Sequence, residues 1–291
     1  MTEHPSPGPG HPSLRTAAEH EAAAHAHPAP AAATSAPTPP DQLPFMAPCR
    51  ELTARAPLSW VAHGWADFRR APGASLAYGA AIVVLSWIVT GVGLKFGTYW
   101  SALILLSGFV FVAPLLALGL YSISRQLHDA PGAPPSISRS IQSMLKSLGT
   151  AMVYAVALLV LFLIWARAAS MVHVFFPMTA NPSLSQMATF LAIGTAVGAV
   201  FSGLTFIFSA FSLPMICDRD TDAVTAIVTS TNAVLRNKPA MAVWAFIIVV
   251  LTAIGFATAL IGLAVVIPVL GYATWHAYED TIDAAAWPAN T

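Results

Sequence analysis

Two histidine–carboxylate pairs stand out as residues whose types and spacing could do chemistry. His63 precedes Asp67 by four positions, and His276 precedes Asp280 by four. In a helix this spacing places each pair on one face, where the imidazole and the carboxylate can share a proton near neutral pH. Three interpretations stay open: a pH sensor, part of a metal site, or a contact that holds the N-terminal and C-terminal segments together. No third or fourth metal ligand is evident, so we predict no metal and no cofactor.

Trp65 and Arg167 are two further candidate functional positions. Trp65 stands between His63 and Asp67, where an indole ring typically anchors a helix at the membrane surface. Arg167 lies in an otherwise apolar stretch. Its guanidinium could bind an anionic head group or a carboxylate of a partner, or its long side chain could simply extend to the interface. The sequence does not decide between these interpretations of Arg167.

The chain that carries these residues has very few charges. Of its 291 residues, 9% are charged and 56% are hydrophobic. A soluble domain carries roughly 25% charged residues, so part of this protein's surface must face lipid. Nucleic-acid binding is excluded as well, because it requires clustered Lys and Arg.

Long apolar runs predict an all-α, polytopic membrane helix bundle. About 20 helical residues cross the ~30 Å hydrocarbon core. The uncharged run from 241 to 275 is too long for one crossing, so we divide it by a turn near Gly255–Gly262. The six predicted transmembrane helices are Ala74–Leu94, Ser101–Ile123, 149–176, Ala188–Ile216 and two within 241–275.

Basic residues are distributed unevenly between the two sides of these six spans. Eleven of the thirteen Lys and Arg fall on the side of the N-terminus, and only Lys95 and Arg167 fall on the other. Loops rich in Lys and Arg stay in the cytoplasm. We therefore predict a multi-pass protein with a cytoplasmic N-terminus.

The segments before the odd-numbered spans have the pattern of interfacial amphipathic helices. Apolar residues recur at helical spacing within 58–68, 137–148 and 224–235, and Asp222 is placed to cap the third helix. Each segment ends in a basic residue followed three positions later by a helix breaker, which predicts a sharp turn into the membrane. The breakers are Pro72, Gly149 and Pro239. We infer three repeats, each an interfacial helix followed by a transmembrane hairpin; the alternative is that amphipathic loops are common in any multi-span protein.

The chain divides into three parts. Residues 1–44 hold ten prolines, eleven alanines and five histidines, and this composition predicts a disordered cytoplasmic tail. Residues 45–283 form the membrane domain, and 284–291 a short C-terminal tail. Within the domain, Gly194, Gly198 and Ser202 have the small-residue spacing that lets helices approach closely, and Pro268 should kink the last span. Either feature could tighten the bundle or line a cavity.

Three motifs resemble a bacterial family of predicted polytopic integral membrane proteins of unknown function. They are Gly64–Pro72, Ser75–Gly79 and Leu270–Tyr278. The resemblance extends over roughly Leu43–Asp283 and implies a six-span protein of the bacterial inner (cytoplasmic) membrane. It implies no catalytic residues.

The predicted spans contain few groups that could carry out a reaction. Their central turns hold no Asp, Glu or Lys, although proton-coupled carriers and enzymes need such groups. We therefore predict a non-enzymatic accessory, assembly or organising component of a membrane complex. Its partners would be the lipid bilayer and a membrane protein or a second copy of the chain. The alternative is a channel or facilitator for a small neutral or amphipathic solute.

Overall fold

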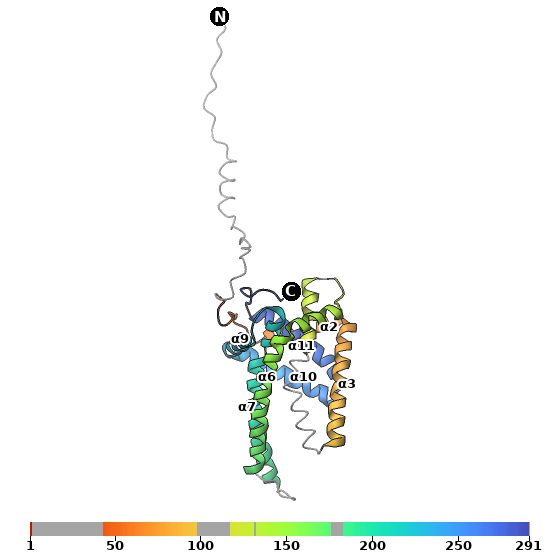
Figure 1. Cartoon of the computed structure of the whole chain (residues 1–291), viewed down its shortest axis with the longest axis vertical. Coiled ribbons are helices and arrows are strands. Elements are labelled where there is room, and N and C mark those ends of the chain that lie inside the picture. The colour runs from red at the N-terminus through yellow and green to blue at the C-terminus, as the bar shows by residue number, and fades with distance from the viewer. Residues whose placement is uncertain (2–42, 98–116, 131, 176–182, 291) are drawn as a thin grey trace. The chain divides into compact units, whose positions relative to one another are not determined.

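Helices make up nearly all the regular structure that is described. The computed structural model describes residues 1, 43–97, 117–130, 132–175 and 183–290, and all of these except Met1 lie in the compact unit 37–291 (Figure 1). The extended pairings found there are two isolated bridges, Cys49 with Ile282 and Arg219 with Ala289. In chain order the helices are α2 (Ala56–Arg70), α3 (Pro72–Phe96), α5 (Leu118–Asp129), α6 (Ile137–Phe175), α7 (Leu184–Ser209), α8 (Ser212–Asp218), α9 (Ala223–Arg236), α10 (Lys238–Ala257) and α11 (Leu263–Thr281).

Four helical stretches of the described chain are long and apolar enough to cross a membrane. They are Pro72–Lys95, Ile137–Val172, Leu184–Asp218 and Lys238–Ala257. The prediction of an all-helical protein with several spans is confirmed. Most of the second predicted span, Ser101–Ile123, lies outside the described residues, and its last residues form the buried start of α5.

The long uncharged run near the C-terminus is divided by a turn into two helices, as predicted, but only the first of them, Lys238–Ala257, is among the four membrane-crossing stretches. Helix α10 ends at Ala257 and α11 begins at Leu263. Ala259 and Leu260 between them have left-handed φ angles of 53° and 71°. The indole Nε1 of Trp87 in α3 donates a hydrogen bond of 2.8 Å to the carbonyl of Ala259, which ties this turn to α3.

Two of the three predicted turns into the membrane are present, those at Pro72 and Pro239, and the turn predicted at Gly149 is wrong. Ala71 separates α2 from α3, and Asn237 separates α9 from α10; a proline is one of the first two residues of the following helix. Proline has no N–H to donate to the preceding turn and its ring clashes with that turn, so a continuous helix is interrupted there, whereas proline fits the first turn of the next helix. Gly149 instead lies inside α6, an unbroken helix of 39 residues. Glycine only lowers helix propensity by about 1 kcal/mol, which is too little to break a helix that is otherwise favourable.

Helices α2 and α9 expose some large apolar side chains while they bury some polar ones. In α2, Leu58 and Trp65 are exposed while Asp67 is buried, and in α9, Leu235 is exposed while Ser230 is buried. A soluble protein would bury the apolar residues. The exposed apolar faces are therefore of the kind that face lipid.

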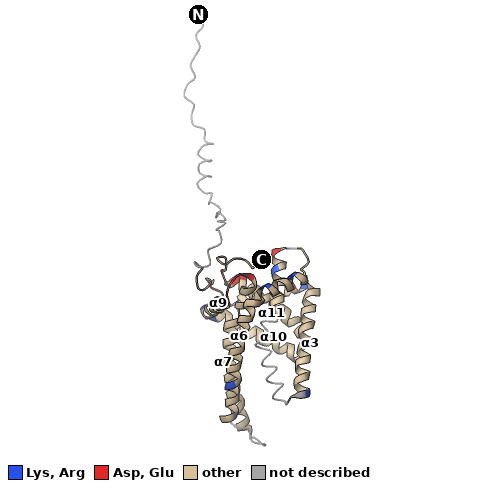
Figure 2. Cartoon of the chain, in the orientation of Figure 1, with Lys and Arg blue, Asp and Glu red and all other residues tan. Residues whose placement is uncertain are grey.

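The hydrophobic core lies close to the charged end of the described unit. Buried aromatic side chains from different elements meet there, including Trp60 of α2, Trp244 of α10 and Trp275 of α11. Figure 2 shows the charged residues gathered around α9, α11 and the C-terminus, with basic positions at the far ends of the long helices. Two basic residues toward these far ends are Lys95, in the last turn of α3, and Arg167 of α6.

Candidate functional site

A buried carboxylate, Asp67, is the centre of the first polar cluster. Its side chain on α2 contacts two other helices: His276 Nε2 of α11 lies 2.8 Å from Oδ2, and the Ser124 hydroxyl of α5 donates to the same oxygen at 2.6 Å. Arg70 NH1 lies 3.6 Å from Oδ1. Burying a charge is costly unless it is paired and hydrogen-bonded, and here both conditions are met. Asp67 therefore joins α2, α5 and α11.

The cluster continues from Asp67 through His276 to a second carboxylate. His276 Nδ1 lies 3.7 Å from Glu279 Oε2, and His128 Nδ1 of α5 lies 3.4 Å from the same oxygen. Burial raises the pKa of the Glu279 carboxyl above its usual value, while the two histidines act in the opposite direction. Imidazoles and carboxylates thus alternate along a row of four side chains from α2, α5 and α11.

The residues of the two predicted pairs come together, but with other partners. The ring of His63 lies 5.1 Å from that of His276, centroid to centroid. Asp67 contacts His276 across the helix interface, and Asp280 Oδ2 accepts a 2.8 Å hydrogen bond from Trp60 Nε1 of α2. Both acids therefore link α2 to α11, as in the interpretation that these residues hold the two ends of the domain together.

Trp65 and Arg167 lie apart from this cluster. The ring of Trp65 stacks on Phe68 at 5.4 Å and is half exposed on α2, which fits an anchoring role at an interface. Arg167 is exposed on α6, about two turns before that helix ends at Phe175. No contact joins it to the other candidate residues within the described chain.

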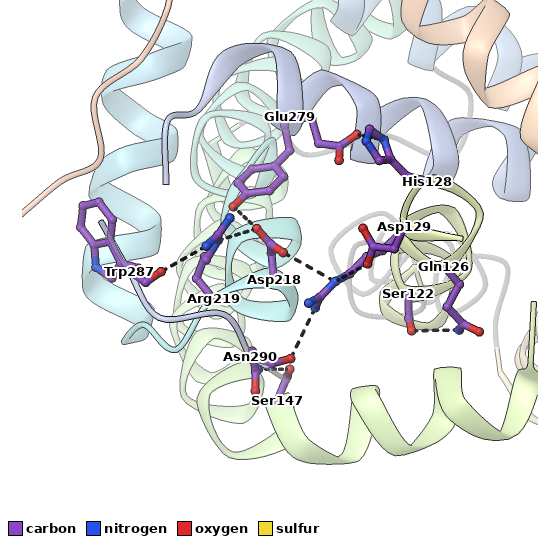
Figure 3. A network of polar contacts seen from close by, with 12 residues as sticks. Ser122, Gln126, His128, Asp129, Ser147, Asp218, Arg219, Glu279, Trp287 and Asn290 are labelled. Carbon is purple, nitrogen blue, oxygen red and sulfur yellow. Dashed lines mark hydrogen bonds and ion pairs between the residues drawn. The ribbon is translucent and has the colours of Figure 1, made fainter. Parts of the chain in front are cut away.

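A second polar cluster, centred on Asp218, was not foreseen from the sequence. Its Oδ2 accepts hydrogen bonds from Arg219 Nε at 2.8 Å and from the Tyr278 hydroxyl at 2.9 Å, and Arg125 Nε lies 3.8 Å from Oδ1 (Figure 3). Burial lowers the pKa of Arg219, but the charge and hydrogen bond of Asp218 and the contact with Tyr278 together outweigh burial, so the pKa is raised. The sequence held one signal for this cluster: Asp218 lies two residues after the end of the predicted span Ala188–Ile216.

The C-terminal segment closes over this second cluster. Asn290 donates a backbone hydrogen bond of 2.8 Å to the Asp218 carbonyl, and its side chain donates to the Ser147 hydroxyl at 2.9 Å. Trp287 is only 3% exposed. The residues predicted as a short tail thus pack against α6 and α8.

A cavity of about 370 Å³ lies between the two clusters. Its wall includes Arg125, His128, Asp218, Trp275 and Glu279, together with the C-terminal segment. In Figure 3, Glu279 and His128 face each other on one side, and Asp218 and Arg219 lie on another. Among the described residues no three His, Cys, Asp or Glu side chains are grouped as metal ligands. The arrangement can bind a charged molecule and join helices.

One comparison with known proteins gives a match. Residues 102–218 match the model of a family described as "Predicted integral membrane protein (DUF2189)". The expected resemblance to a family of predicted integral membrane proteins is confirmed for this segment, although the three motifs that suggested it lie outside. The segment includes Arg125, His128 and Asp218 but not Asp67 or His276. No curated protein and no solved structure matches the chain.

Proposed function

We propose that this integral membrane protein is a non-enzymatic accessory, assembly or organising component of a membrane complex. The observation that carries the proposal is the exposure of the span Leu184–Asp218: only 6% of its most apolar window is buried within the protein. The corresponding windows of the other three spans are 22–28% buried. A span with so few buried residues leaves much of its surface available for another transmembrane helix or for lipid.

The small residues of α7 support a helix as the neighbour. Association of helices in lipid depends on close van der Waals packing, which small residues at spacings of four allow. A Cβ atom built on Gly194 or Gly198 meets no atom of the described chain within 4 Å. Both glycines are partly covered, yet no atom lies within 4 Å of the added Cβ, so this face of α7 leaves room for close packing of a second helix, from a partner protein or another copy.

We further propose six spans in the bacterial inner membrane, with the charged end in the cytoplasm. The grouping of charges around α9, α11 and the C-terminus supports this orientation, as do Lys95 and Arg167 toward the other ends of α3 and α6. The α2–α3 and α9–α10 units support two of the three proposed repeats.

The test is isolation of the full-length protein in mild detergent. We expect it to elute as a homo-oligomer or with a co-purifying membrane protein, as measured by light scattering and mass spectrometry. Gly198→Leu should disrupt this assembly, because the larger side chain fills the small-residue face. Gly203→Leu is the matched control: it makes the same change on the opposite face of α7, where the added side chain also meets no described atom.

Two outcomes would contradict the proposal. One is equal loss of assembly in both glycine variants. The other is a stable monomer that transports a solute into liposomes, which would favour the channel or facilitator. That alternative needs a path along the spans, whereas the cavity described above is lined by charged groups of the polar end.

A further inference from the structure

The cavity between the two polar clusters has walls of both charge signs. Three arginines and four carboxylates line it, so its formal charge is −1 when His128 is neutral. Its volume, about 370 Å³, lies in the range of small-molecule sites, roughly 300–1,000 Å³. A simple anion would meet a net negative lining, and a simple cation would meet the arginines. A molecule that carries both charges avoids both penalties.

Arg125 provides a wall suited to an anionic group. Its side chain is 21% exposed, and its Nε lies 3.5 Å from Asp129 and 3.8 Å from Asp218. Within the described chain its guanidinium makes one hydrogen bond, a long one of 3.4 Å from NH1 to the Asn290 carbonyl. Asp218 is already engaged by Arg219 and Tyr278. Arg125 therefore keeps donors in the planar arrangement that fits the oxygens of a phosphate.

Arg50 adds a second guanidinium to the lining. Its NH1 donates to the backbone carbonyl of Glu279 at 3.1 Å, and the rest of this exposed side chain remains open to a ligand. Two guanidinium groups from separate segments, the one before α2 and α5, thus line the same cavity.

Glu279 provides a wall suited to a cationic group. The Glu279 carboxylate has its two histidine neighbours at 3.4 and 3.7 Å and accepts no hydrogen bond from them. Its side chain is 30% exposed, so a ligand in the cavity can reach it. An ammonium group beside Glu279 would make a charge-assisted contact with this carboxylate.

The two walls do not neutralise each other. No ion pair joins Arg125 to Glu279 within the described chain, and the two side chains come from different helices, α5 and α11. The charges of a ligand that touches both must therefore be separated along its length. A phosphate and an ammonium joined by a short linker carry the two charges on separate groups, one for each wall.

We propose that this cavity binds a zwitterionic phosphate–ammonium group, the chemistry shared by the headgroup of an ethanolamine phospholipid and by free phosphoethanolamine. The phosphate lies against Arg125 and Arg50, and the ammonium lies against Glu279. This assignment does not depend on the accessory role proposed above, because it concerns the ligand of the polar end and not the faces of the spans.

The test is calorimetric titration of the full-length protein in maltoside micelles. The probes are phosphoethanolamine, a short-chain ethanolamine phospholipid, inorganic phosphate and ethanolamine. We expect saturable binding of the zwitterion, at least about tenfold tighter than phosphate or ethanolamine alone, because both charge-assisted contacts contribute. Tighter binding of the phospholipid than of phosphoethanolamine identifies a lipid source, and equal binding identifies a free ligand.

Substitutions test which residues bind the phosphate and which bind the ammonium. Arg125→Gln and Glu279→Gln should each weaken binding of the zwitterion about tenfold or more, and Glu279→Gln should leave phosphate binding unchanged or tighter. Arg139→Gln, an exposed position on α6 outside the lining, is the control and should have no effect. If Arg125→Gln does not fold, Arg50→Gln tests the same wall with an exposed side chain.

The proposal is overturned by any of three results. These are absence of saturable binding by the wild-type protein, equal affinity for phosphate and phosphoethanolamine, or equal weakening by Arg139→Gln and Arg125→Gln.

Discussion

Asp67 shows how one buried carboxylate can organise several helices. It is 4% exposed and has partners on both α5 and α11. An amide in its place has one weaker acceptor oxygen and no charge, which weakens the hydrogen bonds with Ser124 and His276 and removes the ion pair with Arg70. Hydrogen bonds to charged groups contribute roughly 1.5–3 kcal/mol each when buried.

We therefore expect Asp67→Asn to lower the free energy of unfolding by about 2 kcal/mol, measured by thermal unfolding in detergent. Glu51→Gln makes the same chemical change at an exposed carboxylate and should cost less than about 0.5 kcal/mol. Equal effects of the two substitutions would show that the contacts of Asp67 contribute no net stability.

Glu279 should give the protein a pH-dependent stability of defined sign. Burial raises the pKa of this carboxyl in the folded state above the usual 4.5. Because the folded state then binds the proton more tightly than the unfolded state, this contribution is fully present below pH 4.5 and is lost as the pH rises through the folded pKa.

The comparison that isolates Glu279 is the wild type against Glu279→Gln, which cannot ionise. We expect the unfolding temperature of the wild type, relative to that of the variant, to fall between pH 4 and pH 7. A difference that stays constant or rises over this range would contradict the assignment of the raised pKa.

At the scale of elements, backbone sterics decide where helices end. Asp222 caps α9, as the sequence predicted: its side chain accepts hydrogen bonds from the backbone N–H of Val224 and Thr225. The pKa of Asp222 is lowered because these bonds outweigh the effect of burial. The prolines after α2 and α9 likewise act locally. Gly149 does not end a helix, because glycine lowers the stability of a helix but can still adopt its backbone angles.

The packing of α11 against α2 and α3 depends on glycines at the contact. A Cβ on Gly79 would overlap the backbone of Ala264, and one on Gly64 would lie 2.6 Å from the Val269 carbonyl oxygen. Backbone atoms cannot move aside as the end of a flexible side chain can. These two positions therefore permit the close approach that brings His276 to Asp67.

Gly79→Ala should separate α3 from α11 and lower the free energy of unfolding by about 1–3 kcal/mol, as overpacking does. Gly73→Ala, earlier in the same helix, meets no atom within 4 Å and should be neutral or slightly stabilising, because alanine favours helix more than glycine. Thermal unfolding of both variants measures the difference. If the Gly79→Ala protein were as stable as the wild type, α11 could move away from α3 at little cost, which would contradict this prediction.

At the scale of the whole molecule, the distribution of charge predicts an orientation that can be measured. In intact cells a membrane-impermeant maleimide should label Lys95→Cys, which lies on the predicted outer side. Arg139→Cys should be labelled only after the membrane is permeabilised. The unsubstituted protein, with partly buried Cys49 and buried Cys217, gives the baseline. The reverse pattern of labelling would place the N-terminus outside.

The local sequence was sufficient for the properties that depend on composition and on neighbouring residues. The scarcity of charge required a membrane, the apolar runs located the four membrane-crossing stretches of the described chain, and Asp222, Pro72 and Pro239 marked helix boundaries. These effects act within a few residues or through the solvent, so no knowledge of distant contacts was needed.

Only the tertiary structure decided how the candidate residues meet. Asp67 and His276 are 209 positions apart, and their contact requires α11 to fold back against α2. The same folding brings Arg125, Asp218 and Glu279 around one cavity. Pairings at such separations depend on which helix faces come together, and helical spacing alone suggested the nearer partners, His63 with Asp67 and His276 with Asp280. The physical reason is that a buried charge is stabilised by whichever partner the packed helices place beside it.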